Sequence, residues 1–253
     1  MQIRFLGTGT STGVPEVGCN CDVCKSSDKR DQRLRASVLV RTRGKNILID
    51  CGPDFRYQML QTEYEPIAGL LITHEHYDHV GGIDDLRPFC RFGDIEVYAE
   101  SYVADAIVKR IPYCFSEYKY PGVPNLILSR LENKSFLLGD IEITPIRVLH
   151  AQLPIFGYRI GNMAYLTDMK TLPEEEYSKL QGLDILVMDA LRIKEHISHQ
   201  NLAEALIQAK RIGAKRTYFV HMSHHIGLHA EVEKTLPENV YLAYDGQEIE
   251  TMD

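Results

Sequence analysis

The chain has 253 residues, of which 44% are apolar, with a formal net charge of -7 at pH 7. This length and apolar content suit one α/β domain with a sizeable core, so we expect a single domain over residues 1–253. The acidic charge disfavours nucleic acid as a partner, no stretch reaches the roughly 20 apolar residues of a membrane span, and a cytoplasmic location is the default expectation.

Short apolar runs between glycine, proline or charged residues recur along the chain and predict β-strands. In chain order they are Ile3 to Leu6, Ser37 to Val40, Asn46 to Ile49, Leu70 to Ile72, Glu96 to Ala99, Leu126 to Leu128, Ile141 to Val148, Gly157 to Ile160, Ala164 to Leu166, Ile185 to Met188, Thr217 to Val220 and Val240 to Ala243. Helices are predicted over Tyr102 to Arg110, Glu174 to Leu180, Asn201 to Ile212 and Glu231 to Leu236. Many strands and few helices predict two β-sheets with helices outside.

The first predicted strand is followed by Gly7 to Gly13, which reads G-T-G-T-S-T-G. This run lacks the lysine that a phosphate-binding loop places at the start of its helix, and no helical pattern follows it. We therefore interpret the run as a glycine turn that lets the backbone pass close to a functional site.

Three of the six cysteines form a C-x-C-x-x-C cluster at about residues 19–24: Cys19, Cys21 and Cys24. In a reducing compartment such a cluster predicts a structural zinc site, and the alternative is reduced thiols packed in a loop. A tetrahedral zinc needs a fourth ligand, and the segment H-M-S-H-H offers His224 and His225. The spacing alone leaves the choice between these two histidines open.

The segment from Thr73 to Gly82 reads T-H-E-H-Y-D-H-V-G-G and follows a predicted buried strand. Imidazole and carboxylate side chains at this density predict a catalytic site for zinc, iron or manganese rather than a solvated loop. Two metal ions side by side can clamp an attacking oxygen and polarise a phosphoryl or carbonyl oxygen, which is a hydrolytic arrangement.

This motif resembles the H-x-H-x-D-H signature of the metallo-β-lactamase superfamily, whose fold is an αββα sandwich of two mixed β-sheets flanked by helices. The resemblance implies two catalytic divalent metals, zinc or manganese, with a bridging hydroxide as nucleophile. It also implies that Asp50 supports the ligands from behind. The implied ligands are His74, His76 and His150 for one metal, Asp78, His79 and His221 for the other, and Asp168 as the bridge.

The segment Ser198 to Leu206 reads S-H-Q-N-L-A-E-A-L and resembles a segment of the PhnP group of phosphodiesterases within that superfamily. The resemblance implies hydrolysis of a small phosphodiester, cyclic phosphates included, and favours a homodimer. It makes Asp78 and His199 the candidate catalytic residues. His199 is expected to act as a general acid; the alternative is that His199 is a structural residue at the start of a helix. It also implies that His224 is the fourth ligand of the cysteine zinc.

Two other functions stay open: a transfer-RNA 3′ processing nuclease of the same superfamily, and a non-catalytic metal-binding accessory protein similar to PqqB. The aromatic stretch from Pro112 to Gly122 is interpreted as a lid, a subunit contact or a packed loop. Arg192 and Lys194 precede the His199 segment, where they either meet a phosphate or are solvated charges.

Overall fold

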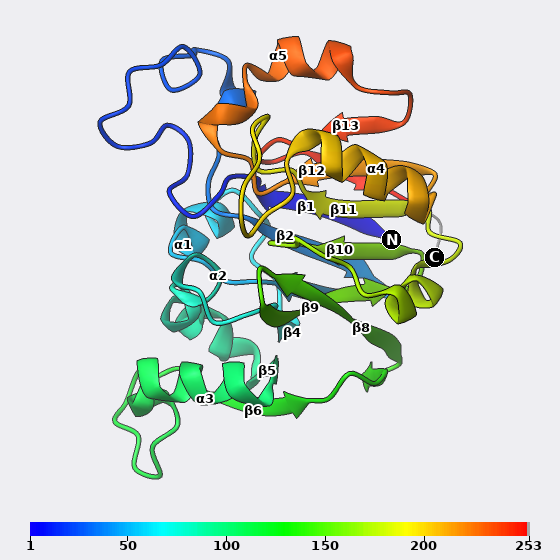
Figure 1. Cartoon of the computed structure of the whole chain (residues 1–253). Helices are drawn as coiled ribbons and strands as arrows, with labels where there is room; N and C mark the ends of the chain where they lie inside the picture. Colours follow the sequence, from blue (N-terminus) through cyan, green and yellow to red (C-terminus); the bar gives the residue numbers. More distant parts are fainter. Residues whose placement is uncertain (252–253) are drawn as a thin grey trace.

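Two seven-stranded β-sheets lie face to face in the computed structural model, which describes residues 1–251 (Figure 1). In the first sheet the strands from β14 to β3 pair antiparallel, and those from β3 to β6 pair parallel. The spatial order is β14 (Glu248–Glu250), β1 (Gln2–Gly7), β2 (Ser37–Thr42), β3 (Lys45–Ile49), β4 (Ile67–Leu71), β5 (Ile95–Glu100) and β6 (Leu126–Leu131).

The second sheet is also mixed. Its strands pair parallel from β13 to β10 and antiparallel from β10 to β7. The spatial order is β13 (Val240–Leu242), β12 (Arg216–Val220), β11 (Ile185–Asp189), β10 (Met163–Leu166), β9 (Leu153–Ile160), β8 (Ile141–His150) and β7 (Phe136–Leu138).

Three apolar clusters hold these layers together. Residues such as Phe5, Ile47 and Tyr158 fill the space between the two sheets. A second cluster packs the outer face of the first sheet against α1 (Phe55–Met59), α2 (Tyr77–Val80), α3 (Ser101–Arg110) and the 3₁₀ helices η2 (Ile83–Phe92) and η3 (Pro112–Cys114). A third packs the second sheet against η4 (Glu174–Leu180), α4 (Leu202–Ile212), η5 (His224–Ile226) and α5 (His229–Val232). The predicted αββα sandwich of two mixed sheets is therefore confirmed.

All twelve predicted strands are present, and two short ones, β7 and β14, were not predicted. The Glu174–Leu180 helix is of the 3₁₀ type, and the one expected over Glu231 to Leu236 is instead α5 followed by η6 (Glu233–Thr235). A further 3₁₀ turn, η1, covers Lys29–Asp31. No helix within residues 1–251 is long and apolar enough to cross a membrane.

The strand ends carry the predicted metal ligands. Since β10, β11 and β12 run parallel, their carboxyl ends meet at one edge of the second sheet. Asp168 follows β10 by two residues, and His221 follows β12 directly. His150 is the last residue of β8. The segment from Thr73 to Gly82, called the histidine loop below, follows β4 of the facing sheet. The ligands thus gather at one edge of the sandwich.

Gly52 lets two loops approach closely at this edge. A Cβ atom on Gly52 would lie 2.1 Å from the backbone oxygen of Asp78, which is far inside van der Waals contact. The same turn contains Asp50, while the Cys51 backbone N–H donates to His79 O at 2.8 Å. Only glycine therefore allows the Asp50 turn to lie against the histidine loop.

Substituting Gly52 by alanine is expected to destabilise the fold by about 1–3 kcal/mol, since the loops must separate. Urea unfolding followed by circular dichroism measures this loss, and metal analysis should show weaker binding. Gly213→Ala serves as the comparison: its φ of 73° is left-handed, but the nearest heavy atom to its Cβ lies at 4.0 Å. Gly213→Ala should cost about 1 kcal/mol and leave metal binding intact. Equal metal loss in both variants would contradict this account.

Candidate metal centre

The seven predicted ligands come together at the edge of the sandwich. His74 Nε2 lies 2.9 Å from His76 Nδ1, and the ring centroids of His76 and His150 are 5.3 Å apart. On the other side, the Asp78 carboxylate lies 3.2 Å from His79 Nε2 and 3.4 Å from His221 Nε2. The two groups of side chains are arranged as a pair of neighbouring cation sites would require.

Asp168 lies between these two groups. On the side of the second group, one of its carboxylate oxygens is 3.2 Å from His79 Nε2 and the other is 3.3 Å from His221 Nε2. The ligand atoms of His74, His79 and Asp168 all lie within 4.8 Å of one another, and the same holds for His150, Asp168 and His199. Asp168 therefore has the position of a ligand shared between two ions.

The backs of the ligands are held by hydrogen bonds. Asp50, fully buried, accepts from His79 Nδ1 at 2.7 Å and from the Thr73 backbone N–H at 2.9 Å. His150 Nδ1 lies 2.9 Å from the Ser198 carbonyl oxygen. A histidine whose Nδ1 proton is engaged in this way turns Nε2 towards the metal. The expectation for Asp50 is thus met by its contacts.

One buried atom tests whether a cation fits here. His79 Nε2 has no hydrogen-bond partner, yet Asp78 and Asp168 each place a carboxylate oxygen 3.2 Å from it. With Nδ1 donating to Asp50, the Nε2 lone pair faces two anionic oxygens, which is unfavourable unless a positive charge lies between them. The residues therefore fit a divalent metal ion.

The pKa values of these groups point the same way. Although burial alone would lower the pKa of His79, the carboxylates of Asp78, Asp168 and Asp50 raise it well above its usual value. Burial would likewise raise the pKa of Asp168, but the nearby imidazoles of His221 and His79 lower it well below its usual value. The field of the site thus favours positive charge, whether a proton or a metal ion supplies it.

The backbone is strained where it delivers the ligands. Asp50, Asp168 and His221 have φ values of 61°, 55° and 56°, in the left-handed region. Ala151, next to His150, also has a positive φ of 52°. Such conformations cost about 1–3 kcal/mol each and persist where the surrounding structure enforces them. Their concentration at this edge marks it as a functional site.

The glycine turn lies beside the ligands, as predicted. The Met222 backbone N–H donates to Thr8 O at 3.0 Å, and Thr10 N–H donates to Met222 O at 3.1 Å. A Cβ atom on Gly7 would lie 2.0 Å from the Arg35 carbonyl oxygen, so no larger residue fits. The turn thereby fixes the residue that follows His221.

His199 lies over the metal centre. Its Nδ1 is buried without a hydrogen-bond partner, 3.7 Å from an Asp168 carboxylate oxygen, and its ring stacks on His221 at 5.1 Å between centroids. Burial lowers the pKa of His199 to about 3, with Asp168 opposing the shift and neighbouring histidines adding to it. Its ring is therefore neutral at pH 7 and offers one N–H, whereas the sequence prediction required a protonated ring.

The start of α4 does not depend on His199. Asn201 is the N-cap: its side chain accepts from the Glu204 backbone N–H at 2.9 Å, and Glu204 accepts from the Asn201 N–H at 2.9 Å. This capping box satisfies the first turn of the helix. The alternative role of His199 as a helix-start residue is therefore not supported by its contacts.

Two residues at this edge contribute more, or differently, than the sequence suggested. Asp189 ends β11 between the strands that deliver Asp168 and His221, and it accepts from the Met169 N–H at 2.8 Å. Burial, followed by the charge of Asp168, raises the pKa of Asp189 to about 8. The sequence does carry a signal for Asp189, a carboxylate directly after the apolar run from Ile185 to Met188, and this signal was missed.

Arg192 donates to the carbonyl oxygens of Lys194 and Glu195, so its guanidinium stabilises its own loop.

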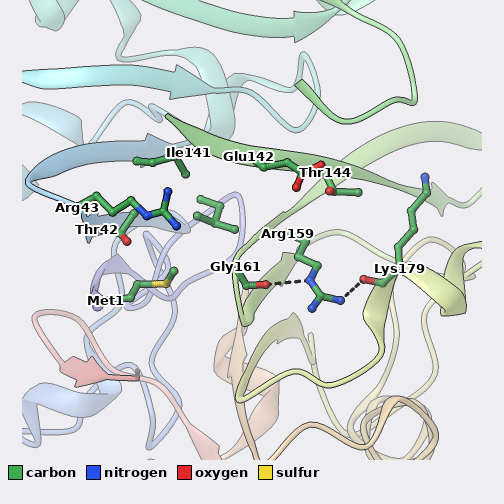
Figure 2. A pocket seen from close by; sticks show the side chains of 10 residues that line it. Met1, Thr42, Arg43, Ile141, Glu142, Thr144, Arg159, Gly161 and Lys179 are labelled. Atoms are coloured by element: carbon green, nitrogen blue, oxygen red, sulfur yellow. Dashed lines mark hydrogen bonds between the residues drawn. The ribbon is translucent and has the colours of Figure 1, made fainter. Parts of the chain in front are cut away.

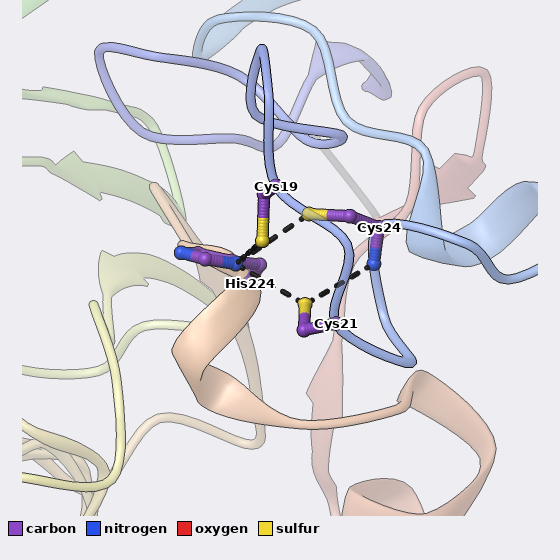
Figure 3. Close-up of side chains that lie close together, drawn as sticks. All are labelled: Cys19, Cys21, Cys24 and His224. Carbon is purple, nitrogen blue, oxygen red and sulfur yellow. Dashed lines mark hydrogen bonds between the residues drawn. The ribbon is translucent and has the colours of Figure 1, made fainter.

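The three clustered cysteines surround one histidine nitrogen (Figure 3). The sulfur atoms of Cys19, Cys21 and Cys24 lie 3.2, 3.3 and 3.4 Å from His224 Nδ1. Across a tetrahedral zinc a sulfur and a nitrogen ligand are about 3.5 Å apart, given bonds of about 2.3 and 2.0 Å. Glu16 lies 3.5 Å from His224 Nε2, where a carboxylate can orient the ligand. The geometry selects His224 rather than His225.

Replacing Cys24 by serine is expected to remove one zinc per chain, because three ligands no longer close the tetrahedron. The midpoint of thermal unfolding should fall by about 5 °C or more, while metal at the catalytic pair is retained. Zinc analysis and a thermal melt measure both effects. Cys90→Ser is the matched control, since Cys90 is half-buried and its thiol donates to Leu86 O instead. Unchanged zinc in Cys24→Ser would refute the site.

His229, whose role the sequence left open, lies in a buried polar network. Its ring Nδ1 is 3.2 Å from Arg33 Nη2, and its backbone N–H donates to Asp31 at 2.7 Å. Arg33 also donates to Thr8 Oγ1 and to Ala243 O. These hydrogen bonds connect Asp31 and Arg33, which follow the cysteine cluster in the chain, to Thr8 of the glycine turn. The role of His229 is therefore structural.

A separate hollow lies at the opposite edge of the sandwich (Figure 2). It includes Ile141, the first residue of β8, whereas His150 is the last, about 30 Å away at the usual rise per residue. Its Arg159 donates to the carbonyls of Gly161 and Lys179, so the guanidinium is already engaged (Figure 2). This hollow is not part of the metal centre.

The chain is similar to known proteins in both sequence and fold. Residues 45–222 match the family model described as "Beta-lactamase superfamily domain". A Porphyromonas gingivalis protein named octanoyltransferase is 46% identical over 98% of this chain, which spans only 51% of that protein. The crystal structure of a diphosphatase from the PhnP family is 38% identical, with a TM-score of 0.93 over 99% of this chain and 98% of the other. Zinc-bound PqqB from Methylobacterium extorquens is 19% identical, with a TM-score of 0.81 over 99% and 100%.

Proposed function

Because the chain belongs to the metallo-β-lactamase superfamily, and within it to the PhnP-like group, we propose that it is a metal-dependent hydrolase of small phosphodiesters. The observation that carries this proposal is the position of Asp168, which lies 3.3 Å from His221 Nε2 of one ligand group and within 4.8 Å of the ligand atoms of His74 and His150 of the other. Such a shared carboxylate suits a pair of divalent metals, zinc or manganese. A third ion, zinc, is proposed at the Cys19, Cys21, Cys24 and His224 site.

When bound, two such ions supply a water that ionises near neutral pH and polarise the phosphoryl oxygens of the substrate. His74, His76 and His150 would hold one ion, and Asp78, His79 and His221 the other. The chain itself orients these side chains through Asp50 and the Ser198 carbonyl. It also keeps most of them away from bulk water, which strengthens their electrostatic effect.

His199 is proposed to act on the leaving group. The support for this role is that its buried Nδ1 has no hydrogen-bond partner and lies 3.7 Å from an Asp168 carboxylate oxygen, at the edge where the metal ligands gather. The single N–H of the neutral ring can donate to the leaving oxygen as negative charge develops there.

Acyl transfer, which the name of the Porphyromonas gingivalis protein would suggest, has less support. That name describes a protein of which this chain spans 51%. A covalent acyl intermediate needs an accessible nucleophile. Cys51 is the cysteine in the turn next to Asp50, but it is fully buried and burial raises the pKa of its thiol well above the usual value. Hydrolysis by an activated water needs no such residue.

Processing of transfer RNA also has less support. A nuclease of this kind needs a basic surface to grip the RNA backbone. The protruding stretch from Pro112 to Gly122 contains one lysine, Lys119, and one glutamate, Glu117, so its charges balance. Tyr118 and Tyr120 at its tip are exposed, which suits a contact surface rather than an electrostatic clamp.

A substrate panel tests the proposal. The metal-loaded protein is offered a ribose cyclic phosphate, a 2′,3′-cyclic nucleotide, a diphosphate diester, a precursor transfer RNA and an octanoyl thioester. Turnover of the small phosphodiesters or the diphosphate, with the RNA and the thioester left intact, supports it. Metal binding without turnover of any phosphoester would instead support an accessory role like that considered for PqqB.

A further inference from the structure

Tyr77 lies inside the histidine loop, between His76 and Asp78, and it is 58% exposed. His76 is exposed as well, whereas the other six proposed ligands of the metal pair are buried. The open side of the metal centre is therefore at His76. His76 and Tyr77 are consecutive in the chain and both are exposed, so Tyr77 is the residue next to that opening.

Arg110, the last residue of α3, lies over the Tyr77 ring, with its guanidinium carbon 5.5 Å from the ring centroid. It also donates to the Glu75 carbonyl oxygen at 3.4 Å, which fixes the end of α3 to the histidine loop. In the other arginine–aromatic pairs within residues 1–251 the ring is buried or half-buried, as in Phe156, Tyr177 and Tyr113. The Tyr77 ring thus remains open to a ligand.

Gly81 lies against the Cε2 and Cζ atoms of the same ring. A Cβ atom on Gly81 would lie 2.8 Å from Cε2 and Cζ of Tyr77, so the ring lies directly against the glycine. Arg110 and Gly81 together hold the aromatic side chain before any ligand arrives. A flat ring with a fixed position and an adjacent positive charge is the arrangement on which nucleobases stack.

We propose that Tyr77 and Arg110 form a stacking platform for a planar aromatic group of the substrate, a nucleobase above all. This inference rests on the proposed function and narrows its substrate class to phosphodiesters that carry such a group. The base would lie on Tyr77 while the phosphodiester reaches over His76 into the metal centre. Arg110 would add attraction for the π-face of the base and for any second phosphate.

Direct binding tests the platform independently of turnover. The chain contains no tryptophan, so Tyr77→Trp introduces one indole whose fluorescence reports on the platform alone. In the metal-loaded variant, adenosine monophosphate should quench this fluorescence at about tenfold lower concentration than ribose 5-phosphate. If both ligands quench the fluorescence at the same concentration, or if neither quenches it, the platform is refuted even if the protein hydrolyses phosphodiesters.

Kinetics provides the second arm. For wild type the ratio of kcat/KM for 2′,3′-cyclic adenosine monophosphate over a base-free ribose cyclic phosphate measures preference for the base. Tyr77→Ala should lower this ratio by about tenfold or more, and Tyr77→Phe should restore it. Arg110→Gln should lower it by about two- to fivefold. Metal content is measured in each variant, so that a loss of metal is not mistaken for a loss of stacking.

Two variants control for charge and for exposure. Lys109→Gln removes a positive charge one residue away on α3, and Tyr57→Ala removes a tyrosine of matched exposure, 59%, on α1. Both should keep the wild-type ratio. A fall of equal size in Lys109→Gln and Arg110→Gln would replace the platform with general electrostatic attraction. If wild type cleaves neither substrate, the proposed function is wrong. The fluorescence titration of Tyr77→Trp then still shows whether the platform binds a base.

Discussion

Replacing Asp168 by asparagine is expected to reduce kcat/KM for phosphodiesters by about a thousandfold or more. Even a residue that only supports a metal ligand costs about 10- to 100-fold when removed. Asp168 contacts His221 of one ligand group and lies within 4.8 Å of the ligand atoms of His74 and His150 of the other, so the loss of its charge weakens both cation sites. Metal analysis of the purified variant should show that at least one of the two catalytic ions is lost.

The control is another aspartate of low exposure, next to a strand of the same sheet. Asp184 precedes β11 at the opposite end from the ligands, where it forms an ion pair with Lys215. Asp184→Asn should keep metal content and turnover, with at most a small loss of stability. Wild-type metal content and activity in Asp168→Asn would show that this carboxylate is not the shared ligand.

Removal of the His199 imidazole should lower kcat by roughly a hundredfold or more for phosphodiesters with poor leaving groups. His199→Gln fills similar space without the imidazole ring. The loss of kcat should be smaller for aryl esters whose leaving oxygen needs no proton, since donation to that oxygen is then unimportant. A series of esters with leaving groups of graded pKa measures this dependence, and metal content should stay unchanged.

His196 offers the matched control for that series. Its ring centroid is 5.1 Å from that of His199, but it is more exposed and contacts Ser198 rather than Asp168. His196→Gln should keep both kcat and its leaving-group dependence. If His199→Gln lost the same activity with every leaving group, or lost metal, its role would be to shape the site.

The strand ends were predictable because each ligand follows an apolar run that has a clear local signal. Leu70 to Ile72 predicts the strand before the histidine loop, and Thr217 to Val220 predicts the one before His221. The three-residue strands β7 and β14 were missed, although the equally short β13 was predicted; β14 contains one apolar residue, Ile249, and the short run of β7 shows no periodicity. Their pairing depends on the neighbouring strand, not on their own residues.

Other features of the site have no local signal. The left-handed backbone at Asp168 and His221 is uncommon for residues other than glycine, and the surrounding structure enforces it. The choice of His224 over His225 required the distances to the three sulfurs. The contact between Arg110 and Tyr77 joins residues far apart in sequence, so only the packing of α3 reveals it.

The most direct test of the paired metal centre is a reconstitution titration. The protein is stripped with a chelator that leaves the cysteine zinc in place, then titrated with zinc or manganese while bound metal and hydrolysis of bis(p-nitrophenyl) phosphate are followed together. We expect activity to rise with two ions per chain beyond the cysteine zinc and to reach a plateau there. Full activity in the stripped protein, or saturation with metal without any hydrolysis, would contradict a hydrolase built on two ions.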